Sequence, residues 1–281
     1  MSPLQILLLQ AGLILAIAPA VAVIAESVAH QKFATLGKDI SEAYQTLVRR
    51  FRMREHGSWV NAAAPAAALA LAIVVAATVP TLAAATPASE YVDMLSLAFI
   101  VSAVATCASA ARAEKSHPAL LGYAIGLGVA VLLASTALLL LGYSGDLGTV
   151  FGSEMPRTAW LALPVISLLL VSGELLRRPT HVAGATLGML ELAQYALATT
   201  LSVFALRFLI EAPLVVGPAS GGEIVASLFT VVGLGLGVGI ACGGARLLFV
   251  RARLEHAQDR FVIILLLAAV SVITALVANF V

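Results

Sequence analysis

The chain has 281 residues, of which 61% are hydrophobic and only 11% are charged, and its formal net charge is +1. Its apolar runs reach the roughly 20 residues that an α-helix needs to cross a bilayer. They are also too long and too uniformly apolar for the alternating strands of a β-barrel. The composition therefore excludes a soluble globular protein and predicts an all-α integral membrane protein.

Eight transmembrane helices are expected within a single transmembrane domain that covers residues 1–281, because no insert between the apolar runs is long. The predicted spans are 4–28, 59–85, 91–112, 118–143, 158–176, 184–210, 222–249 and 259–280. The first run also resembles a secretory signal peptide, since Ala18-Pro19-Ala20 mimics a cleavage site. Met1 to Gln10 carries no Lys or Arg, however, so we interpret the run as the first span.

The segment from Leu36 to His56 combines a basic face with an apolar stripe that has the spacing of an amphipathic helix. The stripe consists of Ile40, Ala43, Tyr44, Leu47, Val48 and Phe51, and the basic face of Arg49, Arg50, Arg52 and Arg54. Asp39, with Glu42 three residues later, is expected to cap the helix N-terminus. We predict a helix on the membrane surface, which is either held by anionic headgroups or forms a platform for a peripheral protein.

Two carboxyl groups fall inside predicted spans, where ionisable groups are costly and often functional. Glu191 lies about two turns into the sixth span, where desolvation favours the protonated form. It is therefore a candidate for proton handling, with a buried structural carboxyl as the alternative. Glu174 lies beside Arg177 and Arg178, so an interfacial salt bridge and a proton relay are both possible interpretations.

Basic residues are distributed unevenly between the two sides of the membrane that the eight spans define. One side receives fourteen of the sixteen Lys and Arg residues, the other side receives Arg157, and Arg207 falls within a span. By the positive-inside rule, the basic loops face the cytoplasm and both termini lie outside. We expect a multi-pass protein of a bacterial-type cytoplasmic (inner) membrane.

No pattern indicates a catalytic or metal centre in this chain. Cys107 and Cys242 lie in separate apolar runs, and the five histidines lack ligand spacing. The glycines between Gly233 and Gly244 follow no predicted strand, so they indicate close helix packing rather than phosphate binding. We therefore expect a non-catalytic membrane protein with no cofactor of its own and no nucleic-acid partner.

Short motifs spread over nearly the whole chain carry a resemblance to known membrane subunits. They are Gln10-Ala11, Ala18-Pro19, Gly37, Ala43-Tyr44, Gly57-Ser58-Trp59-Val60, Ala64-Pro65, Val79-Pro80, Asp93-Met94-Leu95, His117-Pro118, Glu174 with Pro179-Thr180-His181, Leu190-Glu191-Leu192-Ala193, Arg251-Ala252-Arg253-Leu254 and Arg260-Phe261. The chain resembles a membrane subunit family that is shared by energy-converting hydrogenases, formate hydrogenlyase (the hydrogenase-4 type) and respiratory complex I (NADH-quinone oxidoreductase).

The resemblance implies an eight-helix subunit that anchors an oxidoreductase complex. Its cytoplasmic loops would hold hydrogenase-like large and small subunits, and its membrane neighbours would be antiporter-like subunits. Iron–sulfur and nickel–iron centres would belong to those partners. The docking residues implied for this chain are Lys38, Tyr44, Arg49, Arg50, Arg52, Arg54, Arg251 and Arg253.

Several charges of the family are missing here. Thr35-Leu36-Gly37-Lys38-Asp39 replaces an Arg-Arg-Gly-Pro-Gly loop, Gly122-Tyr123-Ala124-Ile125-Gly126 replaces a run with an Arg and a Glu, and Leu133-Ala134-Ser135 lacks a further Glu. In the family these charges line the coupling path, so the departures favour docking over ion translocation. The alternative from another class is a self-contained ion or small-molecule transporter, for which internal repeats are expected and none is found.

Overall fold

A computed structural model of the chain describes residues 3–52, 59–83, 92–112, 118–147, 149–151, 159–176, 184–210, 214–215, 221–252, 254 and 257–279. The helices are α1 (Pro3–His30), α2 (Leu36–Arg52), α3 (Trp59–Thr78), α4 (Met94–Arg112), α5 (Pro118–Leu140), the short 3-10 helix η2 (Ala159–Leu161), α6 (Ala162–Leu175), α7 (Gly184–Arg207), α8 (Gly221–Arg251) and α9 (Ala257–Ala278). Within the described ranges, β pairing is limited to two isolated bridges.

Five of these helices, α1, α5, α7, α8 and α9, contain stretches long and apolar enough to cross a membrane. The described parts of α3, α4 and α6 add three shorter apolar stretches, Ala63–Thr78, Met94–Cys107 and Ala162–Leu175. The chain is therefore an α-helical, multi-pass membrane protein, as its composition predicts.

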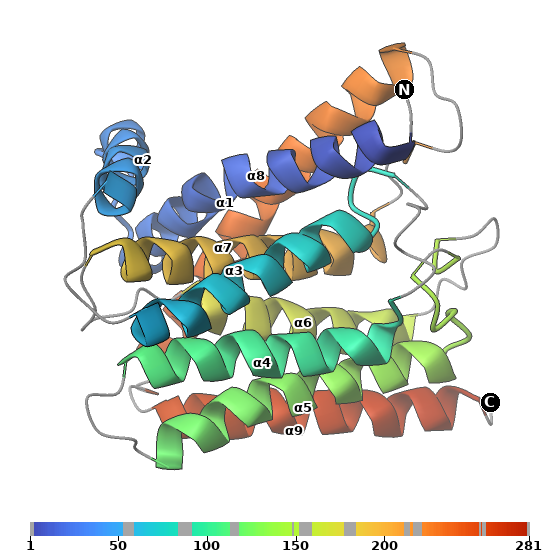
Figure 1. Cartoon of the computed structure of the whole chain (residues 1–281). Helices are drawn as coiled ribbons and strands as arrows, with labels where there is room; N and C mark the ends of the chain where they lie inside the picture. The colour runs from blue at the N-terminus through green and yellow to red at the C-terminus, as the bar shows by residue number, and fades with distance from the viewer. Residues whose placement is uncertain are drawn as a thin grey trace.

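Helix α7 forms the centre of the bundle (Figure 1). It contacts α1, α2, α3, α4, α6 and α8, while α5 packs against both α4 and α9 on one side and α1 packs against α8 on the other. Helix α7 consists largely of apolar and small residues and most of its residues are buried, as is typical of a helix that is covered on every side. A single cluster of buried residues runs through α1 and α3 to α9.

Glycines bring α8 into close contact with α1, at positions four residues apart. A Cβ atom at Gly239 would lie 2.8 Å from Cγ2 of Ile24, and one at Gly243 would lie 2.5 Å from Cβ of Val28. At Gly235 the nearest atom, on Ile17, would be 2.9 Å away. The predicted close packing is confirmed for these three glycines, whereas Gly233, Gly237 and Gly244 face open space.

The bundle has two chemically different ends. We call the end where α1, α4, α6 and α8 finish the basic end, because it carries α2 and most of the described cations: Lys32, Lys38, Arg49, Arg50, Arg52, Arg251 and Arg260. The opposite end, where the chain starts and finishes in Figure 1, is called the distal end.

Several helix boundaries differ from the predictions, and three of them involve a proline or an aspartate. Helix α3 ends at Thr78 and not at residue 85, because Pro80 cannot donate a backbone hydrogen bond. Helix α4 begins at Met94, so that Asp93 lies before it rather than within a span. Helix α2 begins at Leu36, so Asp39 lies in its first turn and not at the N-cap, and the predicted cap is wrong. Asp39 instead accepts a hydrogen bond from the Thr35 hydroxyl at 2.8 Å.

Candidate functional site

Helix α2 lies at the basic end, against α1 and α7, and its inner side is attached by polar contacts (Figure 1). The Tyr44 hydroxyl donates a hydrogen bond to the backbone carbonyl of Ala16 in α1. Partial burial raises the pKa of the Tyr44 phenol, so that the hydroxyl stays protonated and remains a donor. Tyr44, which the family resemblance implies for docking, therefore holds α2 to the bundle.

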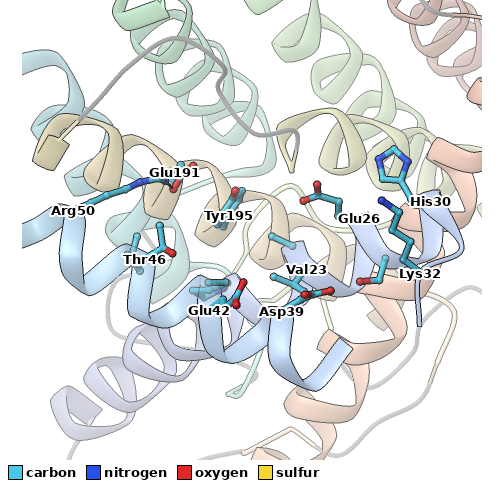
Figure 2. Close-up of a pocket in the computed structure, with 15 residues that line it drawn as sticks. Val23, Glu26, His30, Lys32, Asp39, Glu42, Thr46, Arg50, Glu191 and Tyr195 are labelled. Carbon is cyan, nitrogen blue, oxygen red and sulfur yellow. Dashed lines mark hydrogen bonds and ion pairs between the residues drawn. The ribbon is translucent and has the colours of Figure 1, made fainter. Parts of the chain in front are cut away.

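An ion pair joins α2 to α7. The Arg50 guanidinium contacts the Glu191 carboxylate, whose side chain is only 7% exposed, while that of Arg50 is 26% exposed (Figure 2). Gly188 lies one turn before Glu191, and a Cβ atom there would lie 3.3 Å from Cβ of Arg50 and 3.6 Å from the Phe51 ring. The lack of a side chain at Gly188 thus lets α2 approach α7 closely enough for the pair to form.

A cavity of about 290 Å³ lies between α1, α2 and α7 at the basic end (Figure 2). Its acidic lining consists of Glu26, Asp39, Glu42 and Glu191. Its basic lining consists of His30, Lys32 and Arg50, and apolar side chains such as Val23 and Leu47 complete the wall. Glu191 is therefore both a partner of Arg50 and part of a polar, accessible chamber.

The second candidate carboxyl, Glu174, lies in a separate buried cluster. Its Oε1 atom accepts a hydrogen bond from Nε of Arg260 in α9 at 3.0 Å, and its Oε2 atom accepts one from the Tyr123 hydroxyl in α5 at 2.6 Å. The side chains of Glu174 and Arg260 are 1% and 7% exposed. Nη1 of Arg260 also donates to the Leu254 carbonyl at 2.9 Å, so the pair is supported by further hydrogen bonds.

Aromatic packing keeps this cluster in place. The Phe261 ring meets the Tyr123 ring edge-on, with centroids 6.1 Å apart. The same ring lies against Gly126, where a Cβ atom would come within 2.0 Å of it. The Arg260-Phe261 pair thus acts as a unit, in which one residue binds Glu174 and the other packs beside Tyr123.

Arg260 and Tyr123 are site residues that sequence reasoning missed as partners of Glu174. The sequence suggests Arg177 and Arg178, which lie outside the described residues, because they are close in the chain. Arg260 is 86 residues away from Glu174, and no local spacing connects them. The one available signal is the resemblance of Arg260-Phe261 and Glu174 to motifs of the same family.

The predicted docking residues face different ways. Arg49, Arg52 and Arg251 are exposed at the basic end, whereas Arg50 is turned toward Glu191. Lys38 is exposed and lies 3.8 Å from Glu42 one turn away, a contact of small energetic value. Arg54 and Arg253 lie outside the described residues. The outward basic surface therefore consists of Lys38, Arg49, Arg52 and Arg251.

The two cysteines occupy different helices, and both are free thiols. Cys242 is buried, and its sulfur lies 3.6 Å from the carbonyl oxygen of Leu169. Among the residues that the structure describes, no three His, Cys, Asp or Glu side chains are grouped so that they could hold a metal ion.

No protein-family model matches the sequence, and no curated protein is significantly similar to it.

Proposed function

We propose that the chain is the membrane-anchoring subunit of a complex-I-like or energy-converting, hydrogenase-type oxidoreductase complex. In this proposal α1 and α3 to α9 provide eight spans of a bacterial-type inner membrane, both termini lie outside, and the basic end faces the cytoplasm. The placement of fourteen basic residues on one side supports this orientation. The family resemblance supports hydrogenase-like peripheral subunits and antiporter-like membrane subunits as partners.

The attachment of α2 is the observation that carries the proposal. Tyr44 bonds to α1, Arg50 pairs with Glu191 of α7, and Gly188 allows the close approach. An amphipathic helix that only floated on the headgroups would need no such contacts with the bundle. A helix fixed on its inner side instead presents its outer side in a constant orientation, as a docking platform requires.

The charge of the outward basic surface, which α2 and the end of α8 form together, favours an acidic partner surface. Lys38, Arg49, Arg52 and Arg251 are exposed cations, and complementary charges speed encounter and orient two proteins. Because exposed charges act mainly on association, the interaction should weaken as the salt concentration rises.

Coupling to ion movement is an extension of the same proposal, with Glu191 and Glu174 as the proton-handling candidates. Both carboxyls lie in apolar helices, where ionisable groups are expensive to maintain. Tyr123, which belongs to the segment that replaces family charges, donates a hydrogen bond to Glu174. Tyr123 thus provides a neutral hydrogen-bond donor in a segment where the family has charged residues. This supports a polar path for protons that has fewer charged side chains than in the family.

Purification in a mild detergent at low salt tests the docking proposal. We expect soluble iron–sulfur proteins to copurify with the chain and to be lost from the double variant Arg49→Gln/Arg52→Gln. The matched control, Arg49→Lys/Arg52→Lys, keeps both charges and should retain the partners. Recovery of the wild-type chain only as an isolated homo-oligomer would contradict docking and favour a self-contained transporter.

A further inference from the structure

We infer that the cavity between α1, α2 and α7 binds the headgroup of a zwitterionic phospholipid that carries a primary ammonium group, as phosphatidylethanolamine does. The inference does not depend on the proposed function, because the site belongs to the bundle itself. It rests on the location of the cavity, the balance of its charges and the chemistry of its walls.

The cavity lies at a boundary between polar and apolar surroundings. Its wall includes Pro19 and Val23 of α1 and Leu47 of α2 beside the charged side chains. No residue of α2 is fully buried by protein, and Val48 and Phe51 remain 48% and 43% exposed. Apolar surface next to a charged chamber suits a molecule with a polar head and hydrocarbon chains.

The volume sets what can enter. At about 290 Å³ the cavity lies at the small end of the range for ligand sites, which begins at roughly 300 Å³. It can accommodate a phospholipid headgroup but not the acyl chains. The chains would therefore lie outside it, along the apolar side of α2 and in the surrounding bilayer.

The charges select a zwitterion over an anion. Four carboxylates line the cavity against two fixed cations. Arg50 already pairs with Glu191, and Lys38, which is not part of the lining, lies 3.8 Å from Glu42. An anionic headgroup would meet more like charge than opposite charge. An ammonium group matches Glu26, Asp39 and Glu42, and Lys32 with His30 can bind the phosphate. Figure 2 shows Lys32 and His30 near one end of the cavity and the Arg50–Glu191 pair near the other.

The wall chemistry also distinguishes a primary from a quaternary ammonium. A primary ammonium has three N–H donors that carboxylates accept, whereas a quaternary ammonium has none and is recognised by cages of aromatic rings. Of the described side chains that line the cavity, Tyr195 alone is a Phe, Tyr or Trp, so the wall offers no cage of such rings. The site is thus suited to an ethanolamine headgroup rather than a choline headgroup.

The first test compares lipid classes on the delipidated wild-type protein, with phosphatidylethanolamine, phosphatidylcholine and phosphatidylglycerol of identical acyl chains and native mass spectrometry as the readout. We expect the affinity for phosphatidylethanolamine to be at least about tenfold higher than the affinity for the other two lipids, which is the difference that one or more charged hydrogen bonds would provide. Equal affinity for phosphatidylglycerol or phosphatidylcholine would overturn the inference. Full competition by soluble glycerophosphoethanolamine would assign the site to a water-soluble phosphate ester and would overturn the proposal that the ligand is a lipid.

The second test removes the carboxylates while keeping their shape. The variant Glu26→Gln/Asp39→Asn should lose the preference for phosphatidylethanolamine, and Glu223→Gln, which removes an exposed carboxylate at the start of α8, should keep it. An unchanged preference in the double variant would refute the assignment. If the double variant does not fold, Lys32→Gln in the exposed turn after α1 replaces it. That change should weaken the binding of phosphatidylethanolamine and of phosphatidylcholine by the same factor, because both carry the phosphate. Unchanged binding of both lipids would equally refute the site.

Discussion

The two ends of the bundle satisfy their buried polar groups by different chemistry. At the basic end the Arg50–Glu191 and Arg260–Glu174 ion pairs join separate helices. At the distal end a neutral side chain, Gln10, bonds to five backbone groups around the end of α3. An amide side chain carries no charge, whereas each ion pair depends on the charges of both partners. The comparison assigns a neutral amide network, supplemented by Arg207, to the distal end and paired charges to the basic end.

The Gln10 network has a defined geometry. Its Nε2 atom donates to the carbonyls of Ala76, Ala77 and Val79 at 3.0, 3.1 and 2.7 Å, and its Oε1 atom accepts from the N–H groups of Leu82 and Ala83 at 3.0 and 3.2 Å. These are the backbone groups that lose helical partners when α3 ends before Pro80. Arg207 adds a hydrogen bond to the Thr81 carbonyl of the same turn.

The largest effect is therefore expected from Gln10→Leu. It leaves several buried backbone groups without partners, at about 1–3 kcal/mol each, so the unfolding free energy should fall by roughly 5 kcal/mol or more. Thermal unfolding in detergent measures the loss, and Gln5→Leu, an exposed position on the same helix, is the control. If both variants were equally stable, the Gln10 network would not stabilise the distal end.

The next effect concerns the buried pair of Arg260 and Glu174. Arg260→Met leaves a carboxylate buried without its cation and should cost about 3–5 kcal/mol of unfolding free energy. Adding Glu174→Met should restore much of the stability, since an apolar pair can replace a buried ion pair. Failure of the double variant to recover would show that Glu174 contributes through contacts other than Arg260.

A smaller loss of stability but a larger change of function is expected from Glu191→Gln. The amide still accepts a hydrogen bond from Arg50 but cannot carry a proton, so the cost in unfolding free energy should be about 1–3 kcal/mol. If the carboxyl handles protons, redox-driven proton uptake by vesicles should collapse while the complex stays assembled. Uptake at the wild-type rate would give Glu191 a structural role only.

The smallest effect is expected at Asp93, which precedes α4 at the distal end. Its Oδ1 atom accepts hydrogen bonds from the hydroxyl and, at 2.6 Å, from the backbone N–H of Ser96, and these bonds hold the pKa of Asp93 below its usual value. Asp93→Ala should cost about 1 kcal/mol near pH 7, as the loss of a helix cap does.

The pH dependence of this cap has a definite sign. Because the folded pKa of Asp93 is lowered, the carboxylate stabilises the fold above the unfolded pKa of about 3.9 and loses that contribution as pH falls through the folded pKa. The difference in unfolding temperature between the wild type and Asp93→Ala should therefore shrink below about pH 4. A difference that stays constant to pH 3 would mean that Asp93 acts without its charge.

The helices could be predicted from the sequence because their signals are local. Apolar run length predicts the helices of the bundle, and the stripe from Ile40 to Phe51 predicts α2, whose half-buried residues Ile40, Ala43 and Leu47 face the bundle. Boundaries were less accurate at Pro80 and Asp39, where a turn competes with the helix. Their positions inside apolar runs also singled out Glu174 and Glu191, and both residues are buried.

The partners of those carboxyls could not be predicted in the same way. Arg50 lies 141 residues from Glu191, and Arg260 lies 86 residues from Glu174, so only the packing of helices decides these pairs. Arg50 belongs to a stripe of arginines that looks uniform in the sequence. Gly188, which has no side chain, determines which of them approaches α7.

The contact between α1 and α8 has a consequence for the order of biosynthesis. Helix α1 is synthesised before α8, yet among the described helices it packs most extensively against α8, which begins more than 190 residues after α1 ends. Until then the residues from Ile17 to Val28 lack the glycine-lined surface that will cover them. Helix α1 therefore lacks its main packing partner in the membrane until α8 has been made, and a nascent chain halted before Gly221 would leave the α1 surface from Ile17 to Val28 without that cover.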